Sequence, residues 1–503
     1  MEPIRIFKFY LNYFMVNTRP KPTGVDSRTN PSSLVAGRYG TKDMIDIWGP
    51  EKTFEYCLDA QSNAVSAMNY LYPESVPEED AREIRLNANL EKIDPNRIRE
   101  LEELTGHDII AINTALGEQV SKEAAAHINK GRTSADTTET AKAMQLKEAL
   151  GVIADSLENL RDIILEKSID WINIPHMDTT HLYDALPTVL GRPFAHYGEM
   201  LQSNLEFLNY VYNNSIKGKW GDATGNHHSA IALKMDGRKL ENLYCEDFCK
   251  IGRMMAPAQI PAREFIADCV YVLTRTSETM GNLANYIRMG RSDDVGIFKF
   301  TLGDKGSSAM PHKDAKGGNP RREEQTEGFA NYMEGVMQTT LGSCCFNYGR
   351  DLRASATDRI TLEESFKWGD YVIRNLAKVL YVLEAVEDRC LERVERSYGV
   401  TTSQQVMTYL TDRTRTENPM TREYAHDLVA KLATEAYNAK RPFVDVVLEN
   451  REITELLPED TLRNITDSTQ YIGLSKEIVG DVYANYHGKK TFKGRRVDGD
   501  YLD

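Results

Sequence analysis

The chain has 503 residues, more than the roughly 250 to 300 at which a single hydrophobic core stops growing, so two or three structural units are expected. Hydrophobic residues make up 41% and charged residues 27%, as in globular proteins, and no apolar run approaches the roughly 20 residues of a membrane span. A formal charge of -14 disfavours nucleic acid as a partner, so an anionic substrate would depend on local clusters of Arg, Lys and His.

The first segment along the chain is predicted to be an N-terminal arm. Residues 1–20 mix Glu2, Arg5 and Lys8 into apolar sequence and lack the uninterrupted apolar stretch of a secretory signal. Organellar targeting is the alternative interpretation of this arm.

Two long helices are predicted from the spacing of apolar residues. The first set steps by 4, 3, 4, 3 and 4 residues and comprises Leu146, Leu150, Ile153, Leu157, Leu160 and Ile164. The second set follows a polar segment at 350–359 and comprises Leu362, Phe366, Ile373, Leu376, Leu380 and Leu383. This period places each set on one face of a helix, which is typical of helices packed in a bundle.

Polar or glycine-containing breaks separate the predicted units. They fall near 131–136, 214–228, 302–320 and 397–402. We infer an N-terminal helical unit, a central helix bundle with a loop at 303–320, and a C-terminal helical unit, with the ranges 1–134, 135–396 and 397–503. Alternating strand patterns with Asn-Gly or Asp-Gly turns are scarce, and no solenoid repeat is present. The predicted fold class is all-α.

The seven cysteines form no CxxC pair and have no spacing typical of a metal site or of a disulfide scaffold. Cys245 and Cys249 lie four residues apart and could share a helix face, for which ordinary packing is the expected explanation. We therefore expect no metal and a reducing, cytoplasmic environment.

The break at 302–320 is the richest in chemical groups. In GSSAMPHK, residues 306–313, two hydroxyls follow a glycine, and His312 and Lys313 lie close behind them. The P-loop pattern GxxxxGK[ST] is absent and no strand precedes the segment, so a nucleotide-binding P-loop is not expected. A flexible surface loop is the plain alternative to a catalytic lid.

This segment resembles the signature loop of the aspartase/fumarase superfamily, GSSxMPxKxN, whose members eliminate fumarate from a succinyl group. The resemblance implies that Ser307 is the base that removes the Cβ proton. An alkoxide and a developing aci-carboxylate both require nearby donors and cations, a role assigned to Lys313 and Asn319. Here KDAKGGN replaces KxN, so four residues are inserted between the lysine and the asparagine.

The general acid is expected in THLYDALPTVLG, residues 180–191, which resembles the TH-containing helix region of the superfamily. The resemblance makes His181 the acid for the leaving nitrogen, and imidazole suits this role because its pKa lies near neutrality. Glu324 is expected to orient or charge-stabilise His181. His176 lies five residues upstream and has no matching motif.

Two further segments resemble the carboxylate-binding side of the superfamily: HDIIA at 107–111 and GRTSAD at 131–136. They assign substrate contacts to His107, Asp108, Thr133 and Ser134. The last two precede a predicted long helix, whose free N–H groups favour an anion, and a helix-capping role is compatible with binding. Gly106 stands where many relatives carry arginine.

Within the superfamily, several segments resemble adenylosuccinate lyases. AGRYGTKDMIDIW at 36–48 implies nucleotide contacts by Arg38 and Tyr39. RDLRASATDR at 350–359 resembles a phosphate-binding segment. It contributes Arg350, Ser355 and Arg359, since guanidinium forks and a hydroxyl suit a phosphate dianion. Ion pairs on a helix surface are the alternative role of these arginines.

Three more positions complete the predicted binding set. APAQIPAREFIADC at 256–269 resembles a family region with a substrate-contacting glutamine, here Gln259, and Arg263 is a second shared position. Gln325, beside Glu324, is predicted to make a polar contact with the substrate. Residues 403–479 resemble the C-terminal domain of adenylosuccinate lyases.

The resemblance therefore implies a carbon–nitrogen lyase with a three-domain fumarase/aspartase-like fold and composite active sites in a homotetramer. The expected reaction is an anti β-elimination of fumarate from adenylosuccinate, giving AMP, or from the succinylated aminoimidazole carboxamide ribotide of purine synthesis. No cofactor, nucleic acid or membrane is expected. The alternatives are another superfamily lyase, such as a carboxymuconate cycloisomerase, and a catalytically silent homologue.

Overall fold

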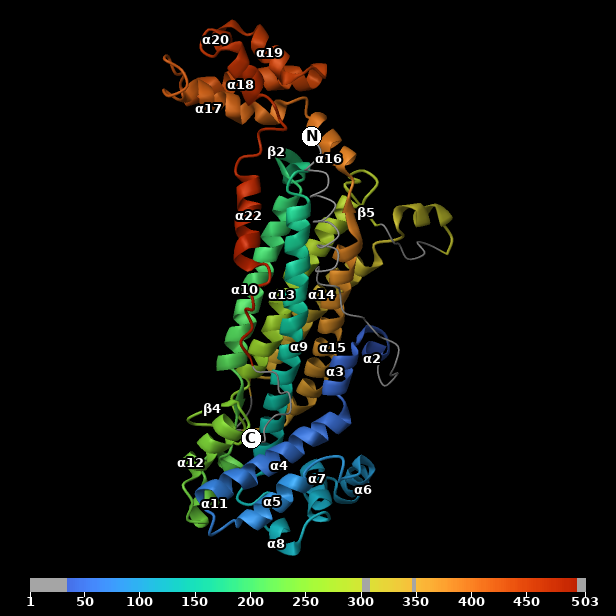
Figure 1. Cartoon of the computed structure of the whole chain (residues 1–503), viewed down its shortest axis with the longest axis vertical. Helices are drawn as coiled ribbons and strands as arrows, with labels where there is room; N and C mark the ends of the chain where they lie inside the picture. Colours follow the sequence, from blue (N-terminus) through green and yellow to red (C-terminus); the bar gives the residue numbers. More distant parts are fainter. Residues whose placement is uncertain (1–33, 301–307, 346–349, 495–503) are drawn as a thin grey trace, which may run out of the picture.

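The computed structural model describes residues 34–300, 308–345 and 350–494 (Figure 1). The predicted N-terminal arm and Ser307 lie outside these ranges. Helices dominate the described residues, and the strands form three sheets of two strands each. The predicted all-α class is confirmed, because these short strands only join or cover helices.

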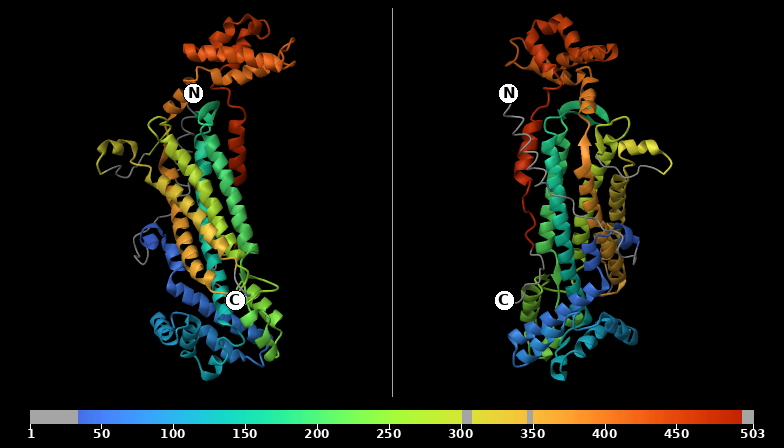
Figure 2. Two further views of the ribbon diagram at one scale, coloured as in Figure 1. Left: turned by 180° about the vertical axis from the view of Figure 1, so that it is seen from behind. Right: turned by 45° about the vertical axis from the view of Figure 1, so that its right-hand side comes forward.

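Long helices form a bundle along the longest axis of the molecule (Figures 1 and 2). They are α9 (Ser134–Asp170), α10 (Gly191–Asn214), α13 (Glu264–Gly290), α14 (Arg321–Gly342) and α15 (Arg353–Val382). All six apolar residues of the first predicted stripe lie on α9 and are fully buried. The second stripe lies on α15 except for Leu383, which follows the helix in an extended conformation and pairs with Phe300. Both predicted helices are thus confirmed.

The N-terminal helices cover one end of the bundle, which we call the base (Figures 1 and 2). They are α4 (Pro50–Leu71), α5 (Glu78–Asn87), α6 (Pro95–Thr105), α7 (Asp108–Gly117) and α8 (Lys122–Ala125). Two short helices, α2 (Leu34–Tyr39) and α3 (Lys42–Ile47), connect them to the flank of the bundle. Because α9, α13 and α15 begin at the base, their free N–H groups gather there.

Short elements complete the base between α10 and α13. They are β3 (Lys217–Gly218), η1 (Asp222–Thr224), α11 (His228–Ala232), α12 (Gly237–Asn242), η2 (Leu243–Phe248) and β4 (Gly252–Arg253). Strands β3 and β4 pair in parallel. Cys245 and Cys249 are both buried here, and Asn63 donates a hydrogen bond of 3.5 Å to the Cys249 sulfur, so packing accounts for them.

At the opposite end, which we call the top, α9 and α10 are joined by an antiparallel hairpin, β1 (Pro175–Thr180) and β2 (Tyr183–Val189). The expectation of a helix around His181 is therefore wrong. His181 and Leu182 both have positive φ, 53° and 66°, a conformation that turns the chain and cannot continue a right-handed helix. Strand β5 (Phe298–Phe300) pairs with β6 (Leu383–Ala385) at the same end.

The C-terminal helices beyond the top have a hydrophobic core of their own, built from residues between 406 and 465. After α16 (Glu387–Glu395) and η4 (Val400–Thr402), the helices are α17 (Ser403–Thr411), α18 (Arg422–Ala439), α19 (Phe443–Glu449), α20 (Arg451–Thr454) and α21 (Glu459–Ile465). Helix α22 (Ser475–Tyr486) then returns along α10 (Figure 1). The division of the chain at residues 134 and 396 stays a prediction.

No helix within residues 34–300, 308–345 and 350–494 is long and apolar enough to cross a membrane. In the same ranges, no group of three or more His, Cys, Asp or Glu side chains is arranged to hold a metal ion.

Candidate functional site

The start of α9 is tied to a loop by one buried carboxylate. Thr133 is the N-cap residue, as its capping interpretation predicted, and its backbone N–H donates to Asp136 at 2.9 Å. The fully buried Asp136 also accepts from the Lys219 ammonium and from the backbone N–H groups of Gly221 and Asp222, at 3.0 and 3.1 Å. These donors satisfy the hydrogen-bonding capacity of the buried carboxylate in the absence of solvent.

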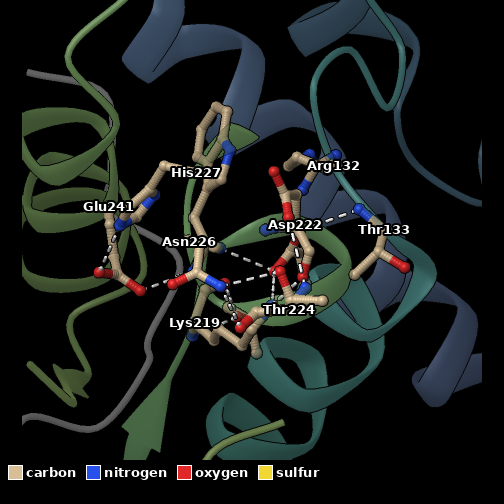
Figure 3. Close-up of polar contacts among 12 residues, drawn as sticks. Arg132, Thr133, Lys219, Asp222, Thr224, Asn226, His227 and Glu241 are labelled. Atoms are coloured by element: carbon tan, nitrogen blue, oxygen red, sulfur yellow. Dashed lines mark hydrogen bonds and ion pairs between the residues drawn. The ribbon is translucent and has the colours of Figure 1, made fainter. Parts of the chain in front are cut away.

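Residues 219–228 form this loop, and their chemistry was not anticipated from the sequence. Figure 3 shows Lys219, Asp222 and Thr224 beside Thr133, with His227 and Glu241 on the other side. Asp222 and His227 have φ values of 57° and 56°, an unusual conformation for residues with a side chain that points to a functional constraint. The sequence marked 214–228 only as a break between units. The signal that could have pointed to its chemistry is the density of Gly, Asp, Thr and Asn followed by two histidines.

The loop also packs tightly against the segment that carries Gln259. Gly225 has a φ of 78°, and a Cβ at this position would lie 2.1 Å from the Pro257 carbonyl oxygen. Only glycine allows this approach. Gln259, two residues further on, is half-buried. The predicted carboxylate pair and the predicted glutamine therefore flank one loop.

His227 and Glu241 form the far side of the loop. The His227 Nε2 atom lies 3.7 Å from Glu241 Oε2, and Glu241 accepts a hydrogen bond of 3.1 Å from the Trp220 backbone N–H. Burial lowers the pKa of His227 and raises the pKa of Glu241. Both shifts favour the neutral forms of these side chains.

A buried ion network joins the starts of α9, α13 and α15. Arg263 donates to Glu139 at 2.7 Å and lies 3.4 Å from Asp358, which also pairs with Lys142 at 3.4 Å. Burial acts to raise the pKa of Glu139, but Lys142 and Arg263, with a contribution from Arg350, hold this pKa below its ordinary value. The buried Arg263 is thus paired with Glu139 and Asp358 inside the protein. The half-buried Arg350 adds positive charge near Glu139.

Arg359 brings two predicted binding segments together. Its guanidinium lies 3.8 Å from the Asp108 carboxylate at the start of α7, and His107 Nδ1 lies 3.2 Å from the same carboxylate. The Arg359 side chain is 76% exposed, so an incoming anion could reach it. Ser355 lies half-buried in the first turn of α15. One predicted phosphate contact, Arg359, therefore lies directly beside Asp108 of the predicted carboxylate-binding side.

Arg38 and Tyr39 lie apart from this cluster, at the end of α2 on the flank of the bundle (Figure 1). The Tyr39 ring stacks on Trp368 at 5.6 Å and meets Tyr371 edge-on at 5.6 Å. Arg38 is exposed. Packing against α15 fixes the tyrosine and leaves the arginine free to turn toward a ligand.

The predicted lid residues lie at the top. Pro311–Lys316 form a 3₁₀ helix that contains Lys313, and Gly317 and Gly318 follow with φ values of 75° and 82°. These turns absorb the insertion and place Asn319 in an exposed position just before α14. Glu324 is exposed and Gln325 half-buried in the first turns of α14. Ser307 precedes the described part of this segment.

The two histidines of the hairpin differ in environment. His181 is exposed at the tip, whereas His176 is buried in β1 and shares a hydrogen bond of 3.2 Å with the Tyr286 hydroxyl. Burial, assisted by the charge of Arg393, lowers the pKa of His176 to about 4. His176 is therefore neutral at pH 7 and hidden from substrate, which favours His181 as the acid. Among the described residues, no hydrogen bond or ion pair joins His181 to Glu324.

The predicted residues therefore form groups at opposite ends of one chain. Helix α9 has 37 residues, and a helix of this length spans about 55 Å at 1.5 Å per residue. Thr133 precedes its base end, and His181 follows its top end. No nucleotide is long enough for one chain to contact it with both residues.

Comparisons with known proteins identify the family of the chain. A family model described as Lyase matches residues 39–333, and one described as Adenylosuccinate lyase C-terminus matches residues 399–482. The chain is 30% identical over 452 residues to an adenylosuccinate lyase of Pyrococcus abyssi, which covers 89% of this chain and 96% of the relative. Identity to the adenylosuccinate lyase of Bacillus subtilis is 29% over 439 residues, or 86% and 96% of the two chains.

Solved structures of similar fold include a fumarate lyase from Mesorhizobium sp. BNC1, with a TM-score of 0.76 and 20% identity over 89% of this chain and 98% of that one. A beta-carboxy-cis,cis-muconate cycloisomerase from Acinetobacter calcoaceticus has a TM-score of 0.75 and 20% identity over 90% and 100% of the two chains. At this level of identity the likeness concerns the fold alone.

Proposed function

The chain belongs to the adenylosuccinate lyase family, and from this membership we propose that it eliminates fumarate from adenylosuccinate to give AMP. The succinylated aminoimidazole carboxamide ribotide of purine biosynthesis carries the same succinyl group on nitrogen and is proposed as the second substrate. The enzyme acts in the cytoplasm in this proposal, since its cysteines are free thiols.

The proposed reaction is an anti β-elimination. Ser307 removes the Cβ proton, and Lys313 and Asn319 stabilise the resulting aci-carboxylate. His181 then donates a proton to the leaving nitrogen. The substrate's own carboxylate delocalises the negative charge, so the mechanism requires no cofactor.

The base binds the anionic parts of the substrate in this scheme. Thr133 and Ser134 contact a succinyl carboxylate at the start of α9, where helix N–H groups favour an anion. Arg350, Ser355 and Arg359 bind the phosphate, with Arg38 and Tyr39 on the nucleotide. His107, Asp108 and Gln259 supply polar contacts at the base, and Gln325 supplies one from the first turns of α14 at the top. Local positive charge at Arg350 and Arg359 offsets the net charge of the chain.

The observation that carries the proposal is the separation of these groups in one chain. Because α9 alone spans about 55 Å, His181 and Lys313 at the top must act on substrate held at the base of another copy. We therefore propose a homotetramer in which copies pack with their bundles antiparallel, so that each active site combines a top and a base from different chains.

The test is a spectrophotometric assay of the purified protein. Adenylosuccinate should lose near-ultraviolet absorbance as fumarate leaves, and a succinyl substrate without phosphate should react far more slowly. Efficient turnover of the phosphate-free compound would instead support a superfamily lyase of the cycloisomerase type. No turnover of either compound is the result expected of a catalytically silent homologue.

The role of the serine is tested with Ser307→Ala. This variant should bind adenylosuccinate with nearly unchanged affinity and lose several orders of magnitude in turnover, as on removal of an essential catalytic group. Near-normal turnover contradicts the assignment of Ser307 as the base.

A further inference from the structure

The chain continues beyond α22 as an extended segment, residues 487–494, which we call the tail. Gly488 has a φ of 68°, which lets the chain leave the helix, and its N–H donates to Asp162 on α9 at 3.1 Å. The tail then runs along the bundle beside α9 and α10 (Figure 1). It lies outside the residues matched by the family models, which end at 482.

A buried carboxylate on α9 is satisfied by this tail. Glu158, whose side chain is 5% exposed, accepts from the backbone N–H groups of Thr491 and Phe492 at 2.8 and 3.0 Å, and from the Lys490 ammonium at 2.7 Å. Within the described ranges, every hydrogen-bond donor to the Glu158 carboxylate belongs to the tail. Without the tail, this carboxylate would have no hydrogen-bond donor from the described residues.

Arg161 makes the complementary contacts one turn away. Its guanidinium, 1% exposed, donates to the Lys489 carbonyl oxygen at 2.8 Å and to the Thr491 hydroxyl at 3.3 Å. Gln202 of α10 donates to the same hydroxyl at 2.9 Å. Thr491 therefore forms hydrogen bonds with three buried side chains. Its backbone N–H donates to Glu158, and its hydroxyl accepts from Arg161 and Gln202.

The remaining contacts follow the groove toward the base. The Phe492 ring meets Tyr212 edge-on at 4.7 Å, and the Lys493 N–H donates to Asn209 at 2.9 Å. At the start of the tail, His487 Nε2 lies 3.3 Å from Glu166 Oε1 on α9. Polar residues at regular helical spacing on α9 and α10 therefore line one continuous track.

From this geometry we propose that α9 and α10 form a peptide-binding groove whose ligand is the chain's own tail, recognised through the backbone N–H groups of Thr491 and Phe492 and through the Thr491 hydroxyl. The tail acts as a strap that holds α22 and the bundle together. This inference does not rest on the proposed function, since no residue of the groove belongs to the proposed active site.

Hydrogen exchange on the intact enzyme tests the groove first. The amides of Thr491 and Phe492 should exchange on the order of 100-fold or more slower than in a free peptide. In the full chain, Glu158→Gln should accelerate their exchange, whereas Lys490→Ala, which removes an ammonium on a side chain that is 79% exposed, should not. Exchange at the free-peptide rate, or equal effects of the two variants, overturns the proposal.

Binding in trans provides the second measurement. A chain ending at Tyr486 should unfold at a lower temperature and recover when the synthetic peptide of residues 487–494 is added at saturation. The same peptide with N-methyl groups on Thr491 and Phe492 keeps its side chains and charge but loses both donors, so it should bind at least about 100-fold more weakly. Equal binding of the two peptides contradicts the groove.

If the shortened chain does not fold, the hydrogen-exchange comparison of Glu158→Gln with Lys490→Ala in the full chain tests the proposal by itself. Protection that disappears on dilution, as for a tail exchanged with a second copy, also overturns the assignment to the chain's own tail.

Discussion

His181 lies at the exposed tip of the β1–β2 hairpin, where His181 and Leu182 both have positive φ and turn the chain. An imidazole in this position is open to solvent in one chain and is presented outward, toward whatever packs against the top. This is the environment expected of an acid that completes a site on another copy.

We expect His181→Asn to lower the kcat for adenylosuccinate by about 10² to 10⁴, the usual contribution of general acid–base catalysis. KM should change little, because the anionic groups of the substrate bind at the base. Steady-state kinetics measure both values. His426→Asn removes an exposed histidine from the C-terminal helices and serves as the control. A kcat for His181→Asn within twofold of the control would exclude His181 as the acid.

His176 predicts a pH dependence of stability rather than of catalysis. Its folded-state pKa of about 4 lies below the value of 6.5 that it takes when exposed, so the unfolded chain binds an extra proton between these values. The stability associated with neutral His176 is complete above pH 6.5 and is lost as the pH falls toward 4, by up to about 3 kcal/mol.

Urea unfolding at pH 7 and pH 5 should reveal this loss. His176→Gln can keep a hydrogen bond to Tyr286 but does not titrate, so its stability should change less between the two pH values. The variant His426→Gln, at an exposed histidine, should lose as much unfolding free energy between pH 7 and pH 5 as the wild type. If His176→Gln loses as much unfolding free energy between pH 7 and pH 5 as the wild type, groups other than His176 govern the acid sensitivity.

At the scale of elements, the hairpin is clamped to α16. Asp184 of β2 accepts from Arg393 at 3.0 Å and from Arg396 at 2.7 Å. The clamp connects the hairpin that carries His181 to the helix that leads into the C-terminal unit. Asp184 is therefore a positioning residue, because it acts on His181 only through the hairpin.

Asp184→Asn should lower kcat several-fold and leave KM nearly unchanged, since misplacing an acid affects the chemical step more than binding. Asp184→Glu should recover part of the loss. Arg396→Ala should have a smaller effect, because Arg393 keeps its pairing with Asp184. Equal losses in kcat and in substrate affinity would indicate general disruption of the fold instead.

The elements differ in how far they could be predicted. Helices α9 and α15 were predictable because burial of one face imposes a period of 3.6 residues on the sequence itself. The hairpin was missed because β1 and β2 lack a clear alternation and their turn, His181–Leu182, has no glycine or asparagine to mark it. The Lys219–Asp136 pair spans 83 positions, and such contacts leave no local pattern.

At the scale of the whole molecule, the two halves of the proposed site are supplied by opposite ends of the bundle. Mixing His181→Asn with Arg359→Ala should therefore restore activity that neither variant has alone. In randomly assorted tetramers, about a quarter of the sites combine an intact top with an intact base. Activity after co-refolding, relative to the wild-type enzyme treated in the same way, measures this recovery.

Arg359 is a suitable partner in this experiment because its side chain is 76% exposed and its loss should not disturb the core. Recovery up to about a quarter of wild-type activity is expected if each site draws on two chains. Activity equal to the mean of the two separate variants would show that each site is built within one chain.

The sequence alone determined the helical class, the two long helices and the family, because helical period and contiguous motifs are local properties of the chain. It also identified the residues to which the chemistry is assigned. Only the tertiary structure decided where they lie: Thr133 and Arg359 at the base, and His181 and Lys313 at the top. The buried contacts of Asp136, Arg263 and Glu158 were also decided there, because each joins residues far apart in the chain and depends on how the helices pack.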